Sequence, residues 1–321
     1  MDVTVALAGD AMFGRGVAAA LDERPDRHLF APEVVEATRS ADLFVLNLEC
    51  CVSDRADARP DPSRVFTFRA PSTALRALTE LDVSCVTLAN NHVLDFGPEA
   101  LLDTFDHLDA ADIRHVGAGR DIEEARAPVL LESGGFRLAV VGVADHPPEY
   151  AAGPDRPGTA FADLRHGVPS WMLELVRNAD ADAVLVTPHW GPNMVAEPLP
   201  YVRAAARALV DAGATVVAGH SAHVIHGVQG PVLYDLGDFL DDYAVDAVLR
   251  NDLGLLWFLT FDRSGPTRLE AVPLKLDYAL TRPAAGRDRE WITRRLSQAC
   301  ARFGTEVHDD GDRLVVSLGS G

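Results

Sequence analysis

Residues 3–10 read VTVALAGD, an apolar run that ends in a glycine and a carboxylate. The run has the length and composition of a buried β-strand, and Asp10 comes directly after it. Four more polar clusters follow apolar runs further along the chain. They are Asn47-Leu48-Glu49, Asn90-Asn91-His92, His189-Trp190-Gly191 and Gly219-His220-Ser221-Ala222-His223. Ligands bind outside the carboxyl ends of the strands in an open α/β sheet, so we expect the five clusters to converge.

The composition limits the class of protein. The chain has 321 residues, 48% of them hydrophobic, and a formal net charge of −19. This acidity excludes non-specific binding to nucleic acid or to an anionic membrane, because phosphate contacts need clustered Lys and Arg. The four Cys form no C-x-x-C pair, which favours a reduced, cytoplasmic protein. The apolar runs are too short to predict a membrane span, and the N-terminus does not resemble a signal peptide.

Strand and helix signals alternate over most of the chain, which predicts an α/β fold. Strands are predicted at 3–8, 43–46, 84–88, 183–187, 216–218 and 232–234, with a hairpin of 129–131 and 137–143. Helices are predicted after Ser72 as an N-cap and at 98–110, 170–178 and 201–211. We expect one domain over residues 1–321, in which 250–321 form a C-terminal β-hairpin, helix and strand extension. The long loops 54–64 and 146–169 are candidate lids or binding loops.

The polar clusters contain residue types that bind metals. Strand alternation places Asn47 and Glu49 on one side, and a Glu can bridge two ions through its two oxygens. In Asn90-Asn91-His92 a carboxamide oxygen suits a metal and the imidazole suits proton transfer. Asp95, three residues after His92, is placed to orient that imidazole. Taken singly, each cluster also fits an ordinary turn, cap or structural histidine.

Taken jointly, the clusters favour a centre with two metals. One Asp, one Glu, one Asn and three His are too many donors for a catalytic zinc ion, which uses three and a water. They suit two divalent ions bridged by a carboxylate. Imidazole ligands favour Mn, Fe, Co or Zn, while oxygen-rich coordination also suits Ca.

An ordered series of motifs runs from residue 2 to residue 239. The motifs are Gly-Asp-x-Met-x-x-Arg, Asn-Leu-Glu, Asn-Asn-His-x-x-Asp-x-Gly, His-Trp-Gly, Gly-His-x-x-His-Val and Leu-Gly-Asp-Phe. The series resembles the CapA family of poly-γ-glutamate capsule proteins, in the calcineurin-like metallophosphoesterase superfamily. The resemblance implies a sandwich of two central mixed β-sheets flanked by helices. On matching positions it implies His92 as the acid/base histidine and, as metal ligands, Asp10, Glu49, Asn91, His189, His220 and His223.

Departures from the family pattern bear on the reaction. Capsule proteins of the family usually carry an N-terminal membrane anchor, which is not expected here. Their Leu-Gly-Asn-Phe is here Leu-Gly-Asp-Phe, which adds the carboxylate of Asp238. The chain thereby resembles soluble members that epimerise the C-terminal residue of lasso-peptide precursors. This similarity favours L-to-D epimerisation of a peptide α-carbon by a metal-dependent enzyme, with His92 and Asp238 as the two bases.

Two alternatives stay open. One is a dinuclear-metal hydrolase of phosphoester or γ-glutamyl amide bonds, related to poly-γ-glutamate. The other is a binding module without catalysis. Candidate substrate contacts are Arg15, which can hold a carboxylate bidentately, with Asn47 and Trp190 beside the predicted ligands. The ordinary roles of Arg15 and Trp190 are a surface ion pair and core packing. A leader-peptide recognition protein is an expected partner if the chain is an epimerase.

Overall fold

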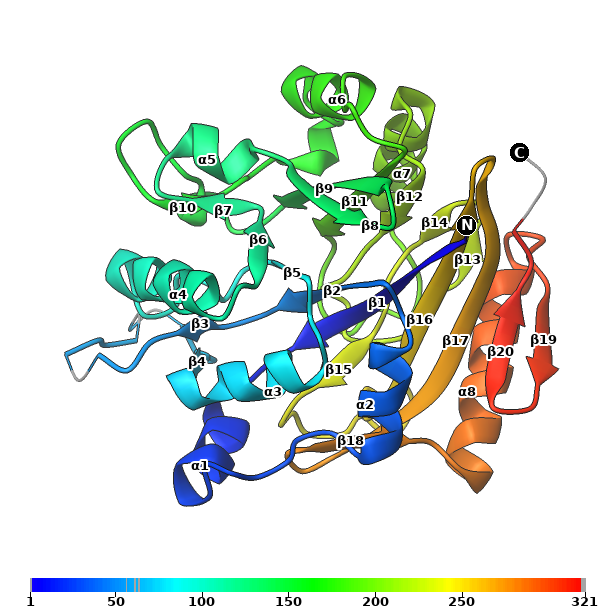
Figure 1. Ribbon diagram of the computed structural model, residues 1–321, viewed down its shortest axis with the longest axis horizontal. Coiled ribbons are helices and arrows are strands. Elements are labelled where there is room, and N and C mark those ends of the chain that lie inside the picture. The colour runs from blue at the N-terminus through cyan, green and yellow to red at the C-terminus, as the bar shows by residue number, and fades with distance from the viewer. Residues whose placement is uncertain (1, 56, 61, 63, 319–321) are drawn as a thin grey trace.

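The computed structural model describes residues 2–55, 57–60, 62 and 64–318 (Figure 1). Its first sheet contains β1 (Val3–Ala11), β2 (Leu43–Leu48), β5 (Cys85–Thr87), β6 (Arg114–Val116), β15 (Asp238–Leu240), β16 (Leu253–Asp262), β17 (Gly265–Asp277), β18 (Leu280–Pro283), β19 (Val307–Asp310) and β20 (Arg313–Val316). The strand order is β19-β20-β17-β16-β1-β2-β5-β6, with β15 beside β1 and β18 beside β17. β1, β2, β5, β6 and β15 run parallel, whereas β16 is antiparallel to β1.

The second sheet lies against the first and is also mixed. It contains β8 (Val129–Ser133), β9 (Phe136–Ala144), β11 (Ala183–His189), β12 (Val216–Ala218), β13 (Val228–Gln229) and β14 (Val232–Leu233). The order is β13-β14-β12-β11-β9-β8, and β8 and β9 form the predicted hairpin. Two small sheets pair β3 (Cys51–Val52) with β4 (Arg69–Ala70), and β7 (Ala118–Gly119) with β10 (Gly158–Thr159). The predicted architecture of two mixed sheets is confirmed.

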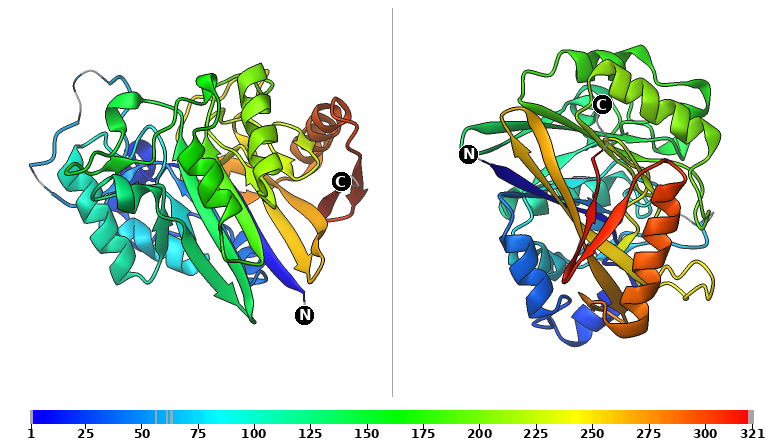
Figure 2. Two further views of the ribbon diagram at one scale, coloured as in Figure 1. Left: turned by 90° about the horizontal axis from the view of Figure 1, so that it is seen from above. Right: turned by 90° about the vertical axis from the view of Figure 1, so that its right-hand side faces the viewer.

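Helices cover the outer faces of both sheets, with one group on each side of the sandwich (Figure 2). The first group is α1 (Arg15–Glu23), α2 (Pro32–Arg39), α3 (Leu75–Glu80) and α4 (Pro98–Ala110), whose apolar residues share one core with the first sheet. The second sheet is covered by α6 (Ser170–Arg177) and α7 (Pro200–Ala212). The remaining helices are α5 (Ile122–Arg126) and α8 (Gly286–Ala301), with 3-10 turns at Ser72–Ala74, Pro148–Tyr150 and Leu164–His166.

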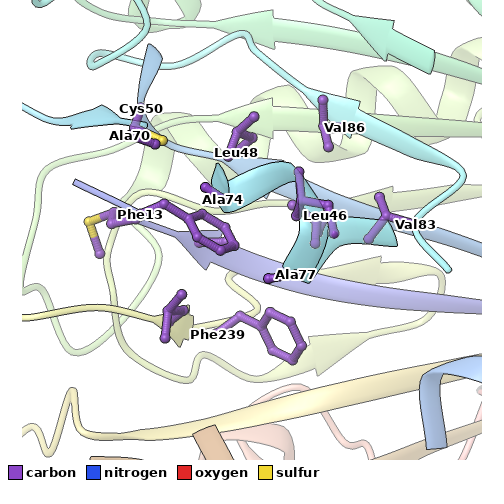
Figure 3. Packing of buried hydrophobic residues seen from close by; sticks show 14 of the residues in the cluster. Phe13, Leu46, Leu48, Cys50, Ala70, Ala74, Ala77, Val83, Val86 and Phe239 are labelled. Atoms are coloured by element: carbon purple, nitrogen blue, oxygen red, sulfur yellow. The ribbon is translucent and has the colours of Figure 1, made fainter. Parts of the chain in front are cut away.

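Alternation along β1 divides its side chains between two cores. Ala6 and Ala8 pack towards the helices, whereas Val5 and Leu7 pack between the sheets. Figure 3 shows the helix-side core, where Leu46 and neighbouring side chains lie against α3. Because β1 is buried on both faces, its sequence is continuously apolar instead of alternating.

Residues 250–318 contribute directly to the main sheet. They supply β16 to β20 and α8, and β16 pairs with β1 from Val3 to Leu7. In α8, Ile292, Leu296 and Cys300 belong to the core between the sheets. The division of the chain into one domain with an extension stays a prediction.

Two local features differ from the predictions. Ser72 is not an N-cap: the 3-10 turn begins after Pro71, which makes no side-chain cap, and the Ser72 N–H donates to Asp54 Oδ1. The helices α1, α2 and α5, of nine, eight and five residues, were not predicted, although α1 buries Val17, Ala20 and Leu21 on one face. Loop 54–64 is described except at residues 56, 61 and 63. Among the described helices, none has both the length and the apolar character to cross a bilayer.

The end of β1 is irregular where Asp10 stands. The β1–β2 register shifts between Ala8 and Asp10, and the β1–β15 register shifts just after Asp10. Such bulges re-aim side chains beside active sites. A Cβ at Gly9 would lie 1.9 Å from the carbonyl oxygen of Gly237, so only glycine fits this approach of β1 to the turn before β15.

We predict that Gly9→Ala lowers the free energy of unfolding by more than about 2 kcal/mol, because the backbone of Gly237 must move. Chemical denaturation measures the change. Gly153→Ala is the matched control, since a Cβ there would meet its nearest atom, on Arg156, at 3.5 Å. Equal stability of the two variants would contradict the packing argument.

Candidate metal centre

Strand ends from both sheets deliver buried polar side chains to one place. β1 and β2 bring Asp10, Asn47 and Glu49, and β15 brings Asp238 from the same sheet. β11 of the second sheet ends at His189, which pairs with His220 through an isolated bridge. No more than 1% of any of these residues, or of His223, is exposed.

Glu49 lies at the centre of the imidazoles. Its Oε1 is 3.8, 3.9 and 4.0 Å from the Nε2 atoms of His92, His189 and His223. These separations are too long for hydrogen bonds, and neither Glu49 Oε1 nor the Nε2 atoms of His189 and His223 have a described hydrogen-bond partner. Ligand atoms that share one ion at bond lengths of about 2.1 Å stand roughly 3–4 Å apart. The donor set and its unpaired atoms therefore fit a divalent cation.

Asp10 belongs to two groups of potential ligands. One group is Asp10, His189 and His220, and the other is Asp10, His223 and Asp238, each with its ligand atoms within 4.8 Å of one another. Asp10 Oδ1 is 3.7 Å from His220 Nδ1, while Oδ2 is 3.1 Å from His223 Nδ1. The two carboxylate oxygens thus face different imidazoles, the arrangement expected of a ligand shared by two ions.

Asn91 and Asn47 differ in what their side chains contact. Asn91 is buried and its Oδ1 has no described partner, which is compatible with metal ligation; this ligand stays a prediction. Asn47 donates to Asp10 Oδ1 (2.7 Å) and Glu49 Oε2 (3.1 Å) and accepts from Asn90 (3.0 Å). The sequence suggested Asn47 as a substrate contact, but these three hydrogen bonds already occupy its side chain. It holds the two carboxylates in position.

Trp190 is also not a substrate contact. It is 2% exposed, its Nε1 donates to the carbonyl of Tyr234, and its ring belongs to the core beneath α7. The sequence allowed two roles for this indole beside His189, substrate contact or core packing. The contacts of Trp190 in the structure are those of core packing.

His92 is held by Asp95. The His92 Nδ1 lies 2.7 Å from Asp95 Oδ2, which also accepts the N–H of Phe68 (2.8 Å). The Tyr150 hydroxyl donates to Asp95 Oδ1 (3.0 Å). The ring of Phe68 packs edge-on against His92. Because Nδ1 is engaged, the Nε2 atom that faces Glu49 is the one available for proton transfer.

Asp238 and Arg15 are the further residues named in the epimerase prediction. Asp238 Oδ1 is 2.8 Å from His223 Nδ1, while Asp238 Oδ2 has no described hydrogen-bond partner, and the role of Asp238 as a base stays a prediction. Arg15 Nε is 3.6 Å from Asp242, and its guanidinium lies over Phe66 and Phe68. With 36% of its side chain exposed, Arg15 stands one aromatic ring away from His92, and its substrate role stays a prediction.

Burial and mutual charge control the ionisation of the cluster. Burial lowers the pKa of His220 to about 4 and raises the pKa of Glu49, which the charge of Asp10 raises further. For His223, burial lowers the pKa, but the charges of Asp238 and Glu49 outweigh burial and the pKa is raised well above its ordinary value. Without metal, His223 is therefore the cation among the carboxylates.

The loop that carries His223 has unusual backbone geometry. Ser221 and His223 have φ of 113° and 60°, a region that non-glycine residues rarely adopt. Hydrogen bonds hold this loop: the Ser221 N–H donates to Asp10 Oδ2 and the Ala222 N–H donates to Asp235 Oδ2. The strained conformation aims His220 and His223 at one centre from positions three residues apart.

Sequence reasoning missed a further polar pair. Asp145 and His146 directly follow β9, and the rings of His146 and His189 lie 5.2 Å apart. Asp145 and His146 could have been found by the pattern that located the other five clusters, namely polar residues directly after an apolar run. They were missed because residues 137–143 were interpreted as one arm of a hairpin, and a hairpin strand does not by itself predict a site.

Comparisons with known proteins agree with this fold. The fold is that of calcineurin-like phosphoesterases and nucleotidases. A putative 5′-nucleotidase from Staphylococcus aureus superposes with a TM-score of 0.50, 14% identity and coverage of 93% of this chain and 58% of that one. A hypothetical protein from Thermus thermophilus gives a TM-score of 0.51, 16% identity and coverage of 85% of this chain and 99% of that one.

The sequence identifies the family within that fold. The sequence model of the family described as bacterial capsule synthesis protein PGA_cap matches residues 4–243, and the chain belongs to this family. A probable polyglutamine synthesis accessory protein of Mycobacterium tuberculosis is 31% identical, over 98% of this chain and 95% of that protein. The capsule biosynthesis protein CapA of Bacillus anthracis is 26% identical, over 98% and 78%.

We predict that divalent metal stabilises the protein and that Asp10→Asn abolishes this effect, because Asp10 belongs to both ligand groups. At a metal concentration 100-fold above Kd the free energy of unfolding should rise by about 2.7 kcal/mol. Thermal unfolding with Mn²⁺, Zn²⁺ or EDTA measures it. Asp180→Asn, whose side chain is 94% exposed, is the control and should respond like wild type. Metal stabilisation that survives Asp10→Asn would place the ion elsewhere.

We also predict that metal binding releases protons and strengthens as pH rises. The pKa of His223 is raised in the metal-free state, so a proton must leave the ring before one of its nitrogens can bind an ion, and lower pH favours the proton. Calorimetry in buffers of different ionisation enthalpy measures the release. Binding that is independent of pH between about 6 and 8 would show that His223 is not a ligand.

Proposed function

We propose that the protein is a metal-dependent hydrolase that cleaves γ-glutamyl amide or phosphoester bonds in polyglutamate-related chemistry. The observation that carries this proposal is Glu49 Oε1, buried and unpaired, with three imidazole Nε2 atoms 3.8–4.0 Å away. Divalent ions held by such a donor set polarise a carbonyl or phosphoryl oxygen and lower the pKa of water. The names of the polyglutamine-synthesis and capsule relatives support the polymer class.

The residues of the chain divide the remaining work. Asp10, Glu49, His189, His220 and His223 would hold the ions. Asp95 fixes the tautomer of His92 by accepting from Nδ1, so Nε2 can take a proton and return it to a leaving group. Burial lowers the pKa of His92, an effect that Asp95 opposes, and a neutral Nε2 can act as a base.

Epimerisation of a peptide α-carbon stays a prediction. It requires two bases on opposite faces of the carbon, and Asp238, the second base, is bonded to His223. The epimerase prediction also includes a peptide substrate and a leader-recognition protein as partner. It places the protein in the cytoplasm, without nucleic-acid or membrane partners. Deuterium incorporation at an α-carbon without bond cleavage would favour epimerisation over hydrolysis.

We predict that the Mn²⁺-loaded protein hydrolyses γ-glutamyl-4-nitroanilide or bis(4-nitrophenyl) phosphate and that His92→Asn lowers kcat by roughly 10²–10⁴-fold. The metal content of the variant should stay at the wild-type level, measured by elemental analysis. His28→Ala is the control, since that side chain is 67% exposed and pairs with Glu80.

Two results would contradict the proposal. One is inertness of the metal-loaded wild type towards both substrate classes. The other is activity that His92→Asn and Asp10→Asn leave intact, because it would belong to a contaminating enzyme. Loss of metal together with activity in His92→Asn would instead make His92 a ligand.

A further inference from the structure

A second aspartate–histidine pair lies beside the metal centre, and the proposed mechanism does not use it. Asp145 and His146 follow β9, whose last residue, Ala144, pairs with His189 on β11. The His146 Nδ1 is hydrogen-bonded to Asp145 Oδ1. Its ring contacts that of His189 at 5.2 Å between centroids. The second sheet therefore places His146, His189 and His220 at neighbouring strand ends.

The surroundings of Asp145 repeat those of Asp95 closely. Asp145 Oδ2 accepts the Tyr201 hydroxyl (2.8 Å) and the Gly191 N–H (3.1 Å). Asp95 likewise accepts a tyrosine hydroxyl, a backbone N–H and an imidazole Nδ1. The backbone N–H of Asp145 also donates to the His189 carbonyl (3.0 Å). Both oxygens of Asp145 are thus committed, and the imidazole of His146 is fixed in orientation.

His146 differs from the other imidazoles of the cluster in its exposure. Its side chain is 32% exposed, while those of His92, His189, His220 and His223 are at most 4% exposed. Among the described imidazoles of this centre, His146 is the one that solvent reaches most readily. A substrate that approaches His189 from this side meets His146 first.

Hydrogen-bond chemistry defines what His146 can recognise. With Nδ1–H directed at the Asp145 carboxylate, the lone pair of Nε2 can accept a hydrogen bond. We propose that His146, held by Asp145, is a substrate-binding residue that accepts a hydrogen bond from the N–H of the scissile amide. The inference rests on the proposed hydrolase and narrows its substrate: an amide carries an N–H beside the scissile bond, whereas an ester or phosphodiester carries none. The preferred substrate class is therefore the γ-glutamyl amide.

The test compares an amide with the ester of the same shape. With metal-loaded protein, His146→Ala should lower kcat/KM for γ-glutamyl-4-nitroanilide about tenfold, the effect of one lost hydrogen bond. For the 4-nitrophenyl γ-ester of glutamate the change should be less than about threefold, because the ester has an oxygen in place of the N–H at the scissile bond. Metal content and melting temperature, measured in parallel, should match those of wild type.

Further variants separate acceptor chemistry from shape. His146→Gln offers an acceptor oxygen and should recover part of the loss. Asp145→Asn keeps the shape, but its amide donates to Nδ1 and moves the ring proton to Nε2, so it should reproduce the selective loss with the anilide. His166→Ala, with a side chain 84% exposed in the same loop, is the control.

The outcomes distinguish this inference from the proposed function. Equal losses with both substrates, or none, would overturn the recognition of the scissile amide N–H, because every other donor is common to the two substrates. If the wild type hydrolyses neither substrate, the hydrolase proposal fails. The role of His146 in substrate recognition is then tested by ligand binding. Calorimetry should then show tighter binding of glutamate γ-methylamide than of its γ-methyl ester, by about tenfold, in wild type but not in His146→Ala. No discrimination by wild type overturns the inference.

Discussion

The buried charge around Asp10 constrains the rest of the structure. Four further buried carboxylic acids surround Asp10 and have raised pKa values: Glu49, Asp235, Asp238 and Asp241. The pKa of Asp10 is instead held low, mainly by the imidazole of His223, with His220 and His189 acting in the same direction. Buried acids are neutralised either by protonation, which raised pKa values favour, or by cations. A bound divalent metal would provide the second kind of balance and give the site its proposed chemistry.

The two sheets contribute different donor atoms to the site. The first sheet carries the oxygen donors Asp10, Glu49 and Asp238. The second carries His189 and, after β12, His220 and His223. An ion bound by both sets would join the sheets at one edge, where the apolar core between them ends. Metal binding and the packing of the sandwich are therefore expected to reinforce each other.

Much of the fold was predictable because strands buried on both faces are continuously apolar. β1, β11 and the helix Pro98–Ala110 follow their predicted ranges closely. The position of Asp10 and Glu49 at neighbouring strand ends followed from parallel topology, whereas their meeting with the histidines also depends on the packing of the second sheet against the first. The contacts of Asn47 and Trp190 could not be predicted in this way. Strand alternation shows on which face of the sheet a side chain lies, but not which other side chains it contacts there. Asn47 faces the site and is fully occupied by two carboxylates and Asn90.

The Asp145–His146 pair shows a second limit, since hydrogen-bond partners distant in sequence leave no local pattern. Tyr201 and Gly191 turn Asp145 into a support for His146, and both come from segments that follow β11. The same arrangement around Asp95 depends on Tyr150, from the loop after β9. Loop 146–169 therefore begins with the imidazole of His146 and, through the Tyr150–Asp95 hydrogen bond, supports the imidazole of His92. Displacing this loop would disturb both histidines, so its effect on the site is structural whether or not it closes over a substrate.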